Sequence, residues 1–140
     1  MEKNVTVKWA GKLTFIGQAG SGDTVTMDAG TGSGGLGLGH SPMDLLLIGA
    51  GGCASIDIIM ILQKGRQDVT DCICQVGGDR AAEHPRRYTD IHMHFIITGK
   101  DLKKEVVERA VTLSMDKYCS VSATLGQGAN INYDFEVIEG

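Results

Sequence analysis

Apolar and polar residues alternate in three short segments near the start of the chain, residues 5–9, 13–16 and 24–27. Alternation with a period of two is typical of β-strands that bury one face. The second and third segments are joined by the glycine-rich residues 17–22, which favour a turn. We therefore predict an antiparallel meander in the N-terminal third of the chain.

A long apolar run follows at residues 45–62, and both of its ends carry helix signals. Ser41 is a suitable N-cap, Pro42 fits the first helical position, and Asp44 completes a capping-box-like Ser-x-x-Asp. Gly65 is placed to end the helix. These signals predict one continuous helix from Pro42 to the residue before Gly65.

This helix is apolar on all of its sides, so we expect it to be buried inside the protein or between subunits. A membrane span is disfavoured, because Ser55 and Asp57 lie in its centre and polar Gln63 and Lys64 end the apolar run. The N-terminus lacks the apolar segment and cleavage site of a secretory signal. Four cysteines without such a signal indicate the reducing cytoplasm.

The second half of the chain contains further strand patterns and a second helix. Three segments alternate as strands: residues 70–76, 90–98 and 131–138. A helix with one apolar face is predicted from an N-cap at Asp101 to about Tyr118, and residues 120–125 add a further turn of helix. The order βββ-α-ββ-α-β predicts an α+β fold with a single domain over residues 1–140.

Composition excludes one class of partner. The chain is 42% hydrophobic and 21% charged, which is ordinary for a globular protein. Its formal net charge is -4 and its acidic and basic residues are interspersed, so no basic stripe is available for nucleic acid.

Cys53 and Cys119 are the strongest candidates for chemistry. Each lies on or at the end of a predicted helix, and the fold alone decides whether they meet. Two thiols that meet on the core side of two helices form a dithiol that can cycle through a disulfide. The alternative is a pair of ordinary buried cysteines, which is the commoner fate of free cysteine.

Two other motifs have weaker readings. Cys72 and Cys74 share one face of a predicted strand, and His92 and His94 share one face of the next, so a Cys2His2 zinc site is an alternative to plain sheet surfaces. The glycine-rich residues 30–39 contain a GxGxxG pattern, but the predicted helix begins too late for a nucleotide-binding turn. We expect neither a metal nor a cofactor.

Asp57 lies one helical turn after Cys53 and on the same face of the predicted helix. A carboxylate there raises the pKa of a neighbouring thiol unless a cation joins it. Asp57 is therefore read either as a supporting site residue or as a partner in a salt bridge or helix-cap contact across a dimer.

Several motifs together resemble the OsmC/Ohr family of osmotically inducible and organic-hydroperoxide-resistance proteins. They are Ser41-Pro42-x-x-Leu45, then Gly52-Cys53 eleven residues past the proline, and finally Lys117-Tyr118-Cys119-Ser120-Val121. The pattern of residues 80–99 is most similar to the YhfA-like branch of that family. The order of strands and helices fits the family over essentially the whole chain.

The resemblance implies an OsmC-like fold, in which antiparallel sheets wrap two central helices and two chains intertwine as a homodimer. It also implies a thiol peroxidase with its sites at the subunit interface. Cys53 would be the peroxidatic residue and Cys119 the resolving one. The substrate would be an organic hydroperoxide, and a dithiol such as a lipoylated protein would restore the reduced form.

The sequence departs from the family's active members at two places. Those members carry a glutamate after the helix-initial proline, which holds an arginine of the N-terminal strands against the thiol. This chain has Met43 there and then Asp44, whose expected role is capping. Residues 1–40 contain no arginine, so Arg80 and its neighbours are the candidates for that cation. The alternative function is an OsmC-like protein without peroxidase activity that binds an apolar ligand between subunits.

Overall fold

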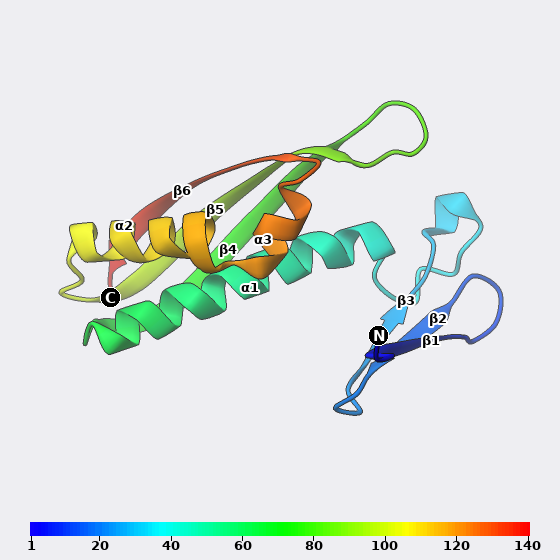
Figure 1. Ribbon diagram of the computed structural model, residues 1–140, viewed down its shortest axis with the longest axis horizontal. Coiled ribbons are helices and arrows are strands. Elements are labelled where there is room, and N and C mark those ends of the chain that lie inside the picture. The colour runs from blue at the N-terminus through cyan, green and yellow to red at the C-terminus, as the bar shows by residue number, and fades with distance from the viewer. The chain divides into compact units, whose positions relative to one another are not determined.

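The computed structural model describes residues 1–140, which form two compact units, residues 1–46 and 47–140. In the first unit, strands β1 (Val5–Trp9), β2 (Phe15–Ala19) and β3 (Thr24–Met27) pair antiparallel in the order β1-β2-β3 (Figure 1). The predicted meander is confirmed. The single domain over the whole chain stays a prediction.

The second strand lies later than residues 13–16, where the alternation placed it. Gly11 and Lys12 have φ angles of 104° and 48° and make a tight turn. Thr14 belongs to this turn, because its N–H donates to the Gly11 carbonyl at 2.9 Å. Its hydroxyl donates to the buried carboxylate of Asp28, also at 2.9 Å. Because Thr14 makes these two hydrogen bonds, it lies in the turn before β2 and is not part of the strand.

Helix α1 (Pro42–Lys64) follows a short 3-10 turn, η1 (Thr31–Ser33), and has the predicted bounds. The second unit then consists of three strands and two helices joined by a π-type turn. They are β4 (Asp68–Arg80), β5 (Tyr88–Lys100), α2 (Lys104–Leu113), η2 (Ser114–Tyr118), α3 (Ser120–Leu125) and β6 (Asn130–Glu139). The α+β class is confirmed.

The second sheet has the order β4-β5-β6, and its two pairings differ in direction. β4 and β5 form a long antiparallel hairpin, whereas β5 and β6 run parallel. The expectation of antiparallel sheets is therefore wrong for this last pair. The chain crosses back through α2 and α3 before β6, and such a helical crossover returns it in the same direction.

Strand β4 continues past residue 76, where the apolar alternation ends. Gly77 and Gly78 stay in the ladder, opposite His92 and Ile91. The ring of Tyr88 lies 2.7 Å from the position that a Cβ would take on Gly78. The glycine therefore lets the aromatic ring pack on the strand, which a pattern of apolar residues alone does not reveal.

Helix α2 begins at Lys104, so the N-cap predicted at Asp101 is wrong. Asp101 has a φ of 53° and lies in the turn that leaves β5. Its N–H donates to the carboxylate of Glu139 at the end of β6, at 3.1 Å. The α-helix also ends earlier than predicted, at Leu113, and the chain continues to Tyr118 as the π-type turn.

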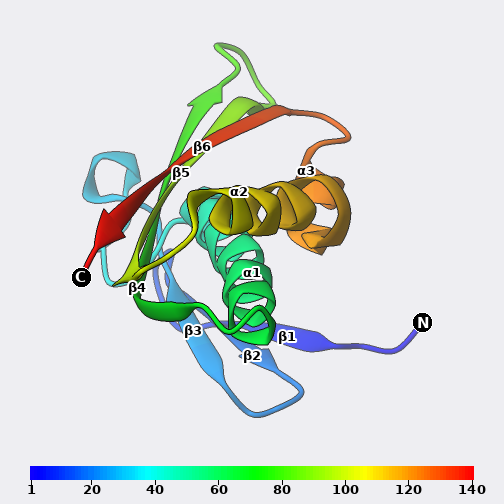
Figure 2. The same ribbon diagram turned by 90° about the vertical axis from the view of Figure 1, so that its left-hand side faces the viewer.

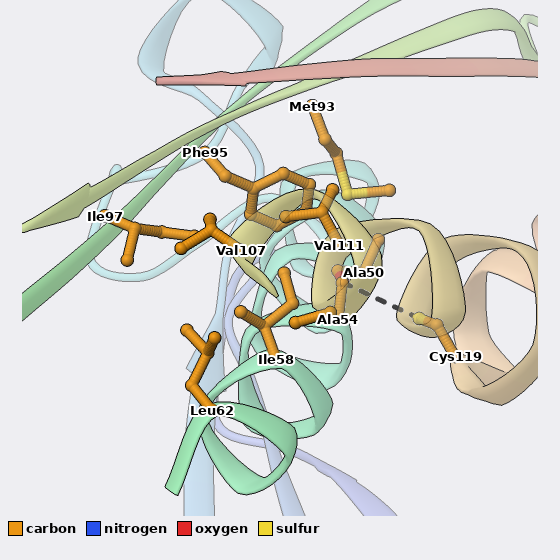
Figure 3. Packing of buried hydrophobic residues seen from close by; sticks show 11 residues of the cluster. Ala50, Ala54, Ile58, Leu62, Met93, Phe95, Ile97, Val107, Val111 and Cys119 are labelled. Atoms are coloured by element: carbon orange, nitrogen blue, oxygen red, sulfur yellow. Dashed lines mark hydrogen bonds between the residues drawn. The ribbon is translucent and has the colours of Figure 1, made fainter. Parts of the chain in front are cut away.

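Helices α1 and α2 lie against one face of the β4–β5–β6 sheet (Figure 2). The fully buried side chains of the two helices interdigitate with alternate residues of β5 (Figure 3). The helices contribute Ala50, Ala54, Ile58, Leu62, Val107 and Val111, and β5 contributes Met93, Phe95 and Ile97. Each large apolar side chain contributes about 1.5–3 kcal/mol when fully buried. Although α1 is long and apolar enough to cross a membrane, in this unit it is a core helix.

Candidate functional site

The structure brings Cys53 and Cys119 together. Cys53 lies in the middle of α1 and is half-buried, whereas Cys119 joins η2 to α3 and is 3% exposed. The Cys119 thiol points at α1 and donates a weak hydrogen bond to the Ala50 carbonyl, with Sγ and oxygen 4.0 Å apart (Figure 3). Its other neighbour is the Cys53 thiol. The predicted dithiol is therefore present within one chain.

Cys119 also caps helix α3. Its Sγ accepts a hydrogen bond from the Ser122 N–H at 3.4 Å. Burial raises the pKa of Cys119, the hydroxyl and N–H of Ser122 oppose the rise, and the Cys53 thiol adds to it. The pKa is raised on balance, so Cys119 is a thiol at neutral pH. A protonated thiol is a poor attacking group.

The π-type turn fixes where Cys119 lies. The N–H of Cys119 reaches back five residues to the Ser114 carbonyl, at 2.7 Å. Ser114 is fully buried, and its hydroxyl donates to the carbonyl of Ala54 on α1 at 2.9 Å. Ser114 and Ser122 were not among the predicted site residues. No capping pattern in the sequence pointed to Ser122, because it is its backbone N–H that binds the Cys119 sulfur.

Asp57 lies one turn beyond Cys53 on α1, as predicted, and lines a pocket of the second unit. Its Oδ2 atom is buried and accepts no hydrogen bond. Such an oxygen normally finds a donor, and its lack of one is costly. Among the candidate supporting residues, Asp57 is therefore the one whose side chain most clearly lacks a hydrogen-bond donor.

The remaining candidates have other roles or partners. Asp44 lies in the first turn of α1, and its N–H donates to the Ser41 hydroxyl at 3.1 Å, so Ser41 is the N-cap as predicted, while a capping role for the Asp44 carboxylate stays a prediction. Met43 precedes it in the same turn. Arg80 ends β4, and its Nε donates to the carbonyl of Arg86 in the hairpin loop at 2.7 Å. A role for Arg80 at the thiols stays a prediction.

Cys72 and Cys74 face α1 from the sheet. The Cys74 sulfur lies 3.5 Å from the position that a Cβ would take on Gly51. Burial raises the pKa of Cys74 to about 11, Cys72 adds to the rise, and the Ser55 hydroxyl opposes it. Burial likewise raises the pKa of Cys72. These two groups are therefore protonated thiols at neutral pH.

His92 and His94 lie on the opposite face of the same sheet. His94 Nδ1 and Nε2 contact the carboxylates of Asp134 and Glu136 on β6, at 2.6 and 3.0 Å. His92 Nε2 contacts the same Asp134 oxygen at 3.1 Å. Since the sheet separates the histidines from Cys72 and Cys74, the Cys2His2 zinc alternative is wrong.

The glycine-rich loop of the first unit folds around the carboxylate of Asp28. Asp28 is 2% exposed and accepts a hydrogen bond from the Leu38 N–H at 3.2 Å. A Cβ on Gly35 would lie 1.9 Å from the Ala29 carbonyl oxygen, so only glycine fits there. The glycines serve this close backbone approach.

A sequence profile of the family described as "OsmC-like protein" matches residues 32–134. Protein YhfA of Escherichia coli strain K12 is 48% identical over 132 residues, covering 94% of this chain and 96% of YhfA.

Solved structures agree with the sequence match. A hypothetical protein from Aquifex aeolicus VF5 superimposes with a TM-score of 0.87 at 30% identity, covering 100% of this chain and 99% of the other. An organic hydroperoxide resistance protein OsmC from Legionella pneumophila, also described as a predicted redox protein, gives 0.72 at 16% identity, covering 98% and 99%. The latter likeness concerns the fold alone.

The paired cysteines on an α+β scaffold of this topology define a class of small thiol proteins. This chain belongs to the OsmC-like family.

Proposed function

We propose that this protein is a thiol-dependent redox enzyme that reduces organic hydroperoxides through Cys53 and Cys119. The observation that carries the proposal is the pairing of these two thiols on the core side of α1, with Cys119 buried and held as a thiol. Cys53 is half-buried and so can contact a substrate, while the buried Cys119 thiol lies beside it.

The proposed cycle has three steps. The Cys53 sulfur attacks the terminal oxygen of ROOH, so that an S–O bond forms, the O–O bond breaks, and the alcohol ROH leaves with the proton that the thiol lost. Cys53 is then a sulfenic acid, and the Cys119 sulfur displaces its hydroxyl as water to form a disulfide. Thiol–disulfide exchange with a dithiol, such as a lipoylated protein, supplies two electrons and restores both thiols.

The proposed assembly is a homodimer in the cytoplasm. Helix α1 exposes three large apolar side chains of the second unit, Ile48, Ile56 and Met60, with exposed fractions of 53%, 62% and 50%. A surface of this kind on one helix is typical of a subunit interface. Ile56→Glu is expected to shift the sedimentation coefficient from dimer to monomer. Ile73→Glu, which alters an exposed isoleucine on β4, serves as the matched control.

A second candidate function is binding of an apolar ligand between subunits, without peroxidase activity. It is favoured by Met43 at the position of the family's glutamate and by the lack of arginine in residues 1–40. Without an activating cation, Cys53 attacks peroxide slowly.

The decisive experiment is a single-turnover assay. Reduced protein is mixed with cumene hydroperoxide or hydrogen peroxide, and the Cys53–Cys119 disulfide is quantified by mass spectrometry after acid quenching. We expect stoichiometric disulfide with the organic peroxide, sulfenic acid that persists in Cys119→Ser, and no oxidation at these positions in Cys53→Ser. The double variant Cys72→Ser/Cys74→Ser is the matched control and should react like the wild type. Absence of disulfide after minutes at millimolar peroxide would favour the second candidate.

A further inference from the structure

Ser122, which follows Cys119 in the first turn of α3, has a buried hydroxyl without a hydrogen-bond partner. The residue is 5% exposed, and its Oγ atom makes no hydrogen bond while Cys119 is a thiol. Buried hydroxyls are normally paired, and an unpaired one lowers stability. The hydroxyl is therefore better suited to a second state of the site, in which it has an acceptor.

The hydroxyl belongs to the residue whose backbone already binds the Cys119 sulfur. The N–H of Ser122 donates to Cys119 Sγ at 3.4 Å, which brings the Ser122 side chain next to this atom. The hydroxyl and the N–H both favour the charged form of Cys119, because each lowers the pKa that burial raises. One residue thus supplies two donors to one sulfur.

The Cys119 sulfur also has an acceptor beside it. Its S–H group donates to the Ala50 carbonyl, with Sγ and oxygen 4.0 Å apart (Figure 3). This carbonyl suits a thiol and not a thiolate, which has no proton to donate. A neutral thiol is in turn a weak acceptor for the Ser122 hydroxyl, whereas a thiolate is a strong one. The two neighbours of the sulfur therefore match its two protonation states.

Cys119 carries negative charge in two steps of the proposed cycle. When it attacks the sulfenic acid of Cys53, the S–S bond forms, the S–O bond breaks, and the thiol's proton ends on the hydroxide that leaves as water. In the reduction, a thiolate of the dithiol attacks the Cys53 sulfur and expels Cys119 as a thiolate. Cys53 is the sulfur attacked because it is half-buried, whereas Cys119 is 3% exposed. The second sulfur of the dithiol then displaces Cys53, so both electrons and both protons come from the dithiol.

We propose that the Ser122 hydroxyl is a catalytic group that stabilises the Cys119 thiolate, both when Cys119 attacks and when it leaves. The inference rests on the proposed function and adds a residue to its mechanism. The Ser122 N–H positions the sulfur, and the hydroxyl binds it when it is charged. The hydroxyl that has no partner in the reduced protein is thus a donor for the charged state.

The first test is a titration that does not depend on peroxidase activity. In the triple variant Cys53→Ser/Cys72→Ser/Cys74→Ser, Cys119 is the one thiol left, and its ionisation is followed by ultraviolet thiolate absorbance. Adding Ser122→Ala removes the hydroxyl and keeps the backbone N–H. The loss of a hydrogen bond to a charged group should raise the pKa of Cys119 by about 1 to 2.

The second test follows the two redox steps in the chain with all four cysteines. A higher pKa leaves roughly tenfold to a hundredfold less thiolate at pH 7, partly offset by the greater nucleophilicity of a more basic sulfur. In Ser122→Ala we therefore expect the disulfide to form from the sulfenic acid about threefold to tenfold more slowly. Sulfenic acid should form on Cys53 at the wild-type rate. Reduction of the disulfide by dithiothreitol should slow by the same factor as its formation.

The reduction potential separates this role from a structural one. The hydroxyl is unpaired beside the thiol and binds only the thiolate, so its loss should leave the potential of the disulfide at pH 7 unchanged in a glutathione buffer. Misplacement of Cys119 would instead change the potential. Ser122→Thr keeps a hydroxyl and should restore both rates. Ser120→Ala, which removes an exposed hydroxyl from the same helix, is the matched control and should behave as the wild type.

The outcomes distinguish this inference from the function on which it rests. An unchanged pKa of Cys119 in Ser122→Ala, or a changed potential with only one direction slowed, would overturn the inference and leave the peroxidase intact. If no hydroperoxide oxidises Cys53, the proposed function is wrong. The titration, and the reduction of a disulfide made with diamide, then still decide whether the Ser122 hydroxyl stabilises the Cys119 thiolate. Circular dichroism establishes that each variant is folded.

Discussion

Ile58 offers the sharpest test of how the second unit is held together. It lies on the inner face of α1 with no exposed surface, between Ala54 and Leu62. Ile58→Ala removes three carbon groups, each worth about 0.8 kcal/mol of transfer free energy, or roughly 2.4 kcal/mol together. The cavity left behind adds to this, so we expect a loss of about 3–4 kcal/mol in the free energy of unfolding. Ile58→Val, which removes one group, should cost about 1 kcal/mol.

The matched control is Ile56→Ala on the same helix, where the side chain is 62% exposed. Within one chain this change should cost less than about 1 kcal/mol, because little apolar surface is lost and alanine has the better helix propensity. Urea unfolding followed by far-UV circular dichroism gives both values at one protein concentration. Equal losses for Ile58→Ala and Ile56→Ala would refute the assignment of an inner and an outer face of α1.

Three further substitutions and one labelling experiment have definite expected results. Ser114→Ala should lower the free energy of unfolding by about 1 kcal/mol, since it removes one buried hydrogen bond between η2 and α1, and should slow Cys53–Cys119 disulfide formation in the same single-turnover assay. Hydrogen bonds to Asp134 and Glu136 raise the pKa of His94 above its ordinary 6.5, so their contribution is complete below pH 6.5 and disappears as pH rises through that raised value. His94→Gln should therefore lower the urea midpoint near pH 6 and leave it unchanged near pH 9. Iodoacetamide at pH 8 should label Cys53 before the other three cysteines, because burial holds their pKa values above the ordinary 9.0, and peptide mapping would reveal any other order. Asp57→Asn should raise the free energy of unfolding by up to about 1 kcal/mol, since it replaces a carboxylate whose buried Oδ2 has no donor, and a fall on urea unfolding would mean that this carboxylate has a partner.

Local patterns predicted those elements whose boundaries depend on local chemistry. Helix α1 begins at Pro42 because Ser41 caps it, and both residues can be read directly from the chain. The strands were found wherever apolar and polar residues alternate. The errors fall where a distant residue decides the local conformation. Asp28 takes Thr14 out of β2, and Glu139 binds the N–H of Asp101 before α2 begins.

The direction of β6 relative to β5 could likewise not be predicted from the sequence. A strand pattern records which residues face the core, and it is the same for parallel and antiparallel neighbours. Only the length and path of the crossover through α2 and α3 make β6 parallel to β5. Similarly, the two faces of the sheet separate the histidines from Cys72 and Cys74, although the residues of each pair share one face of their strand.

The candidate site depends most strongly on contacts between distant residues. The spacing of Cys53 and Cys119 in the sequence left open whether they meet, and the resemblance to a family suggested that they do. In the structure, the meeting depends on Ser114, whose carbonyl binds the Cys119 N–H and whose hydroxyl binds the Ala54 carbonyl. A π-type turn places one extra residue in the helical path and so changes the direction in which Cys119 points. The residue that aligns the two thiols is thus a serine that has no redox chemistry of its own.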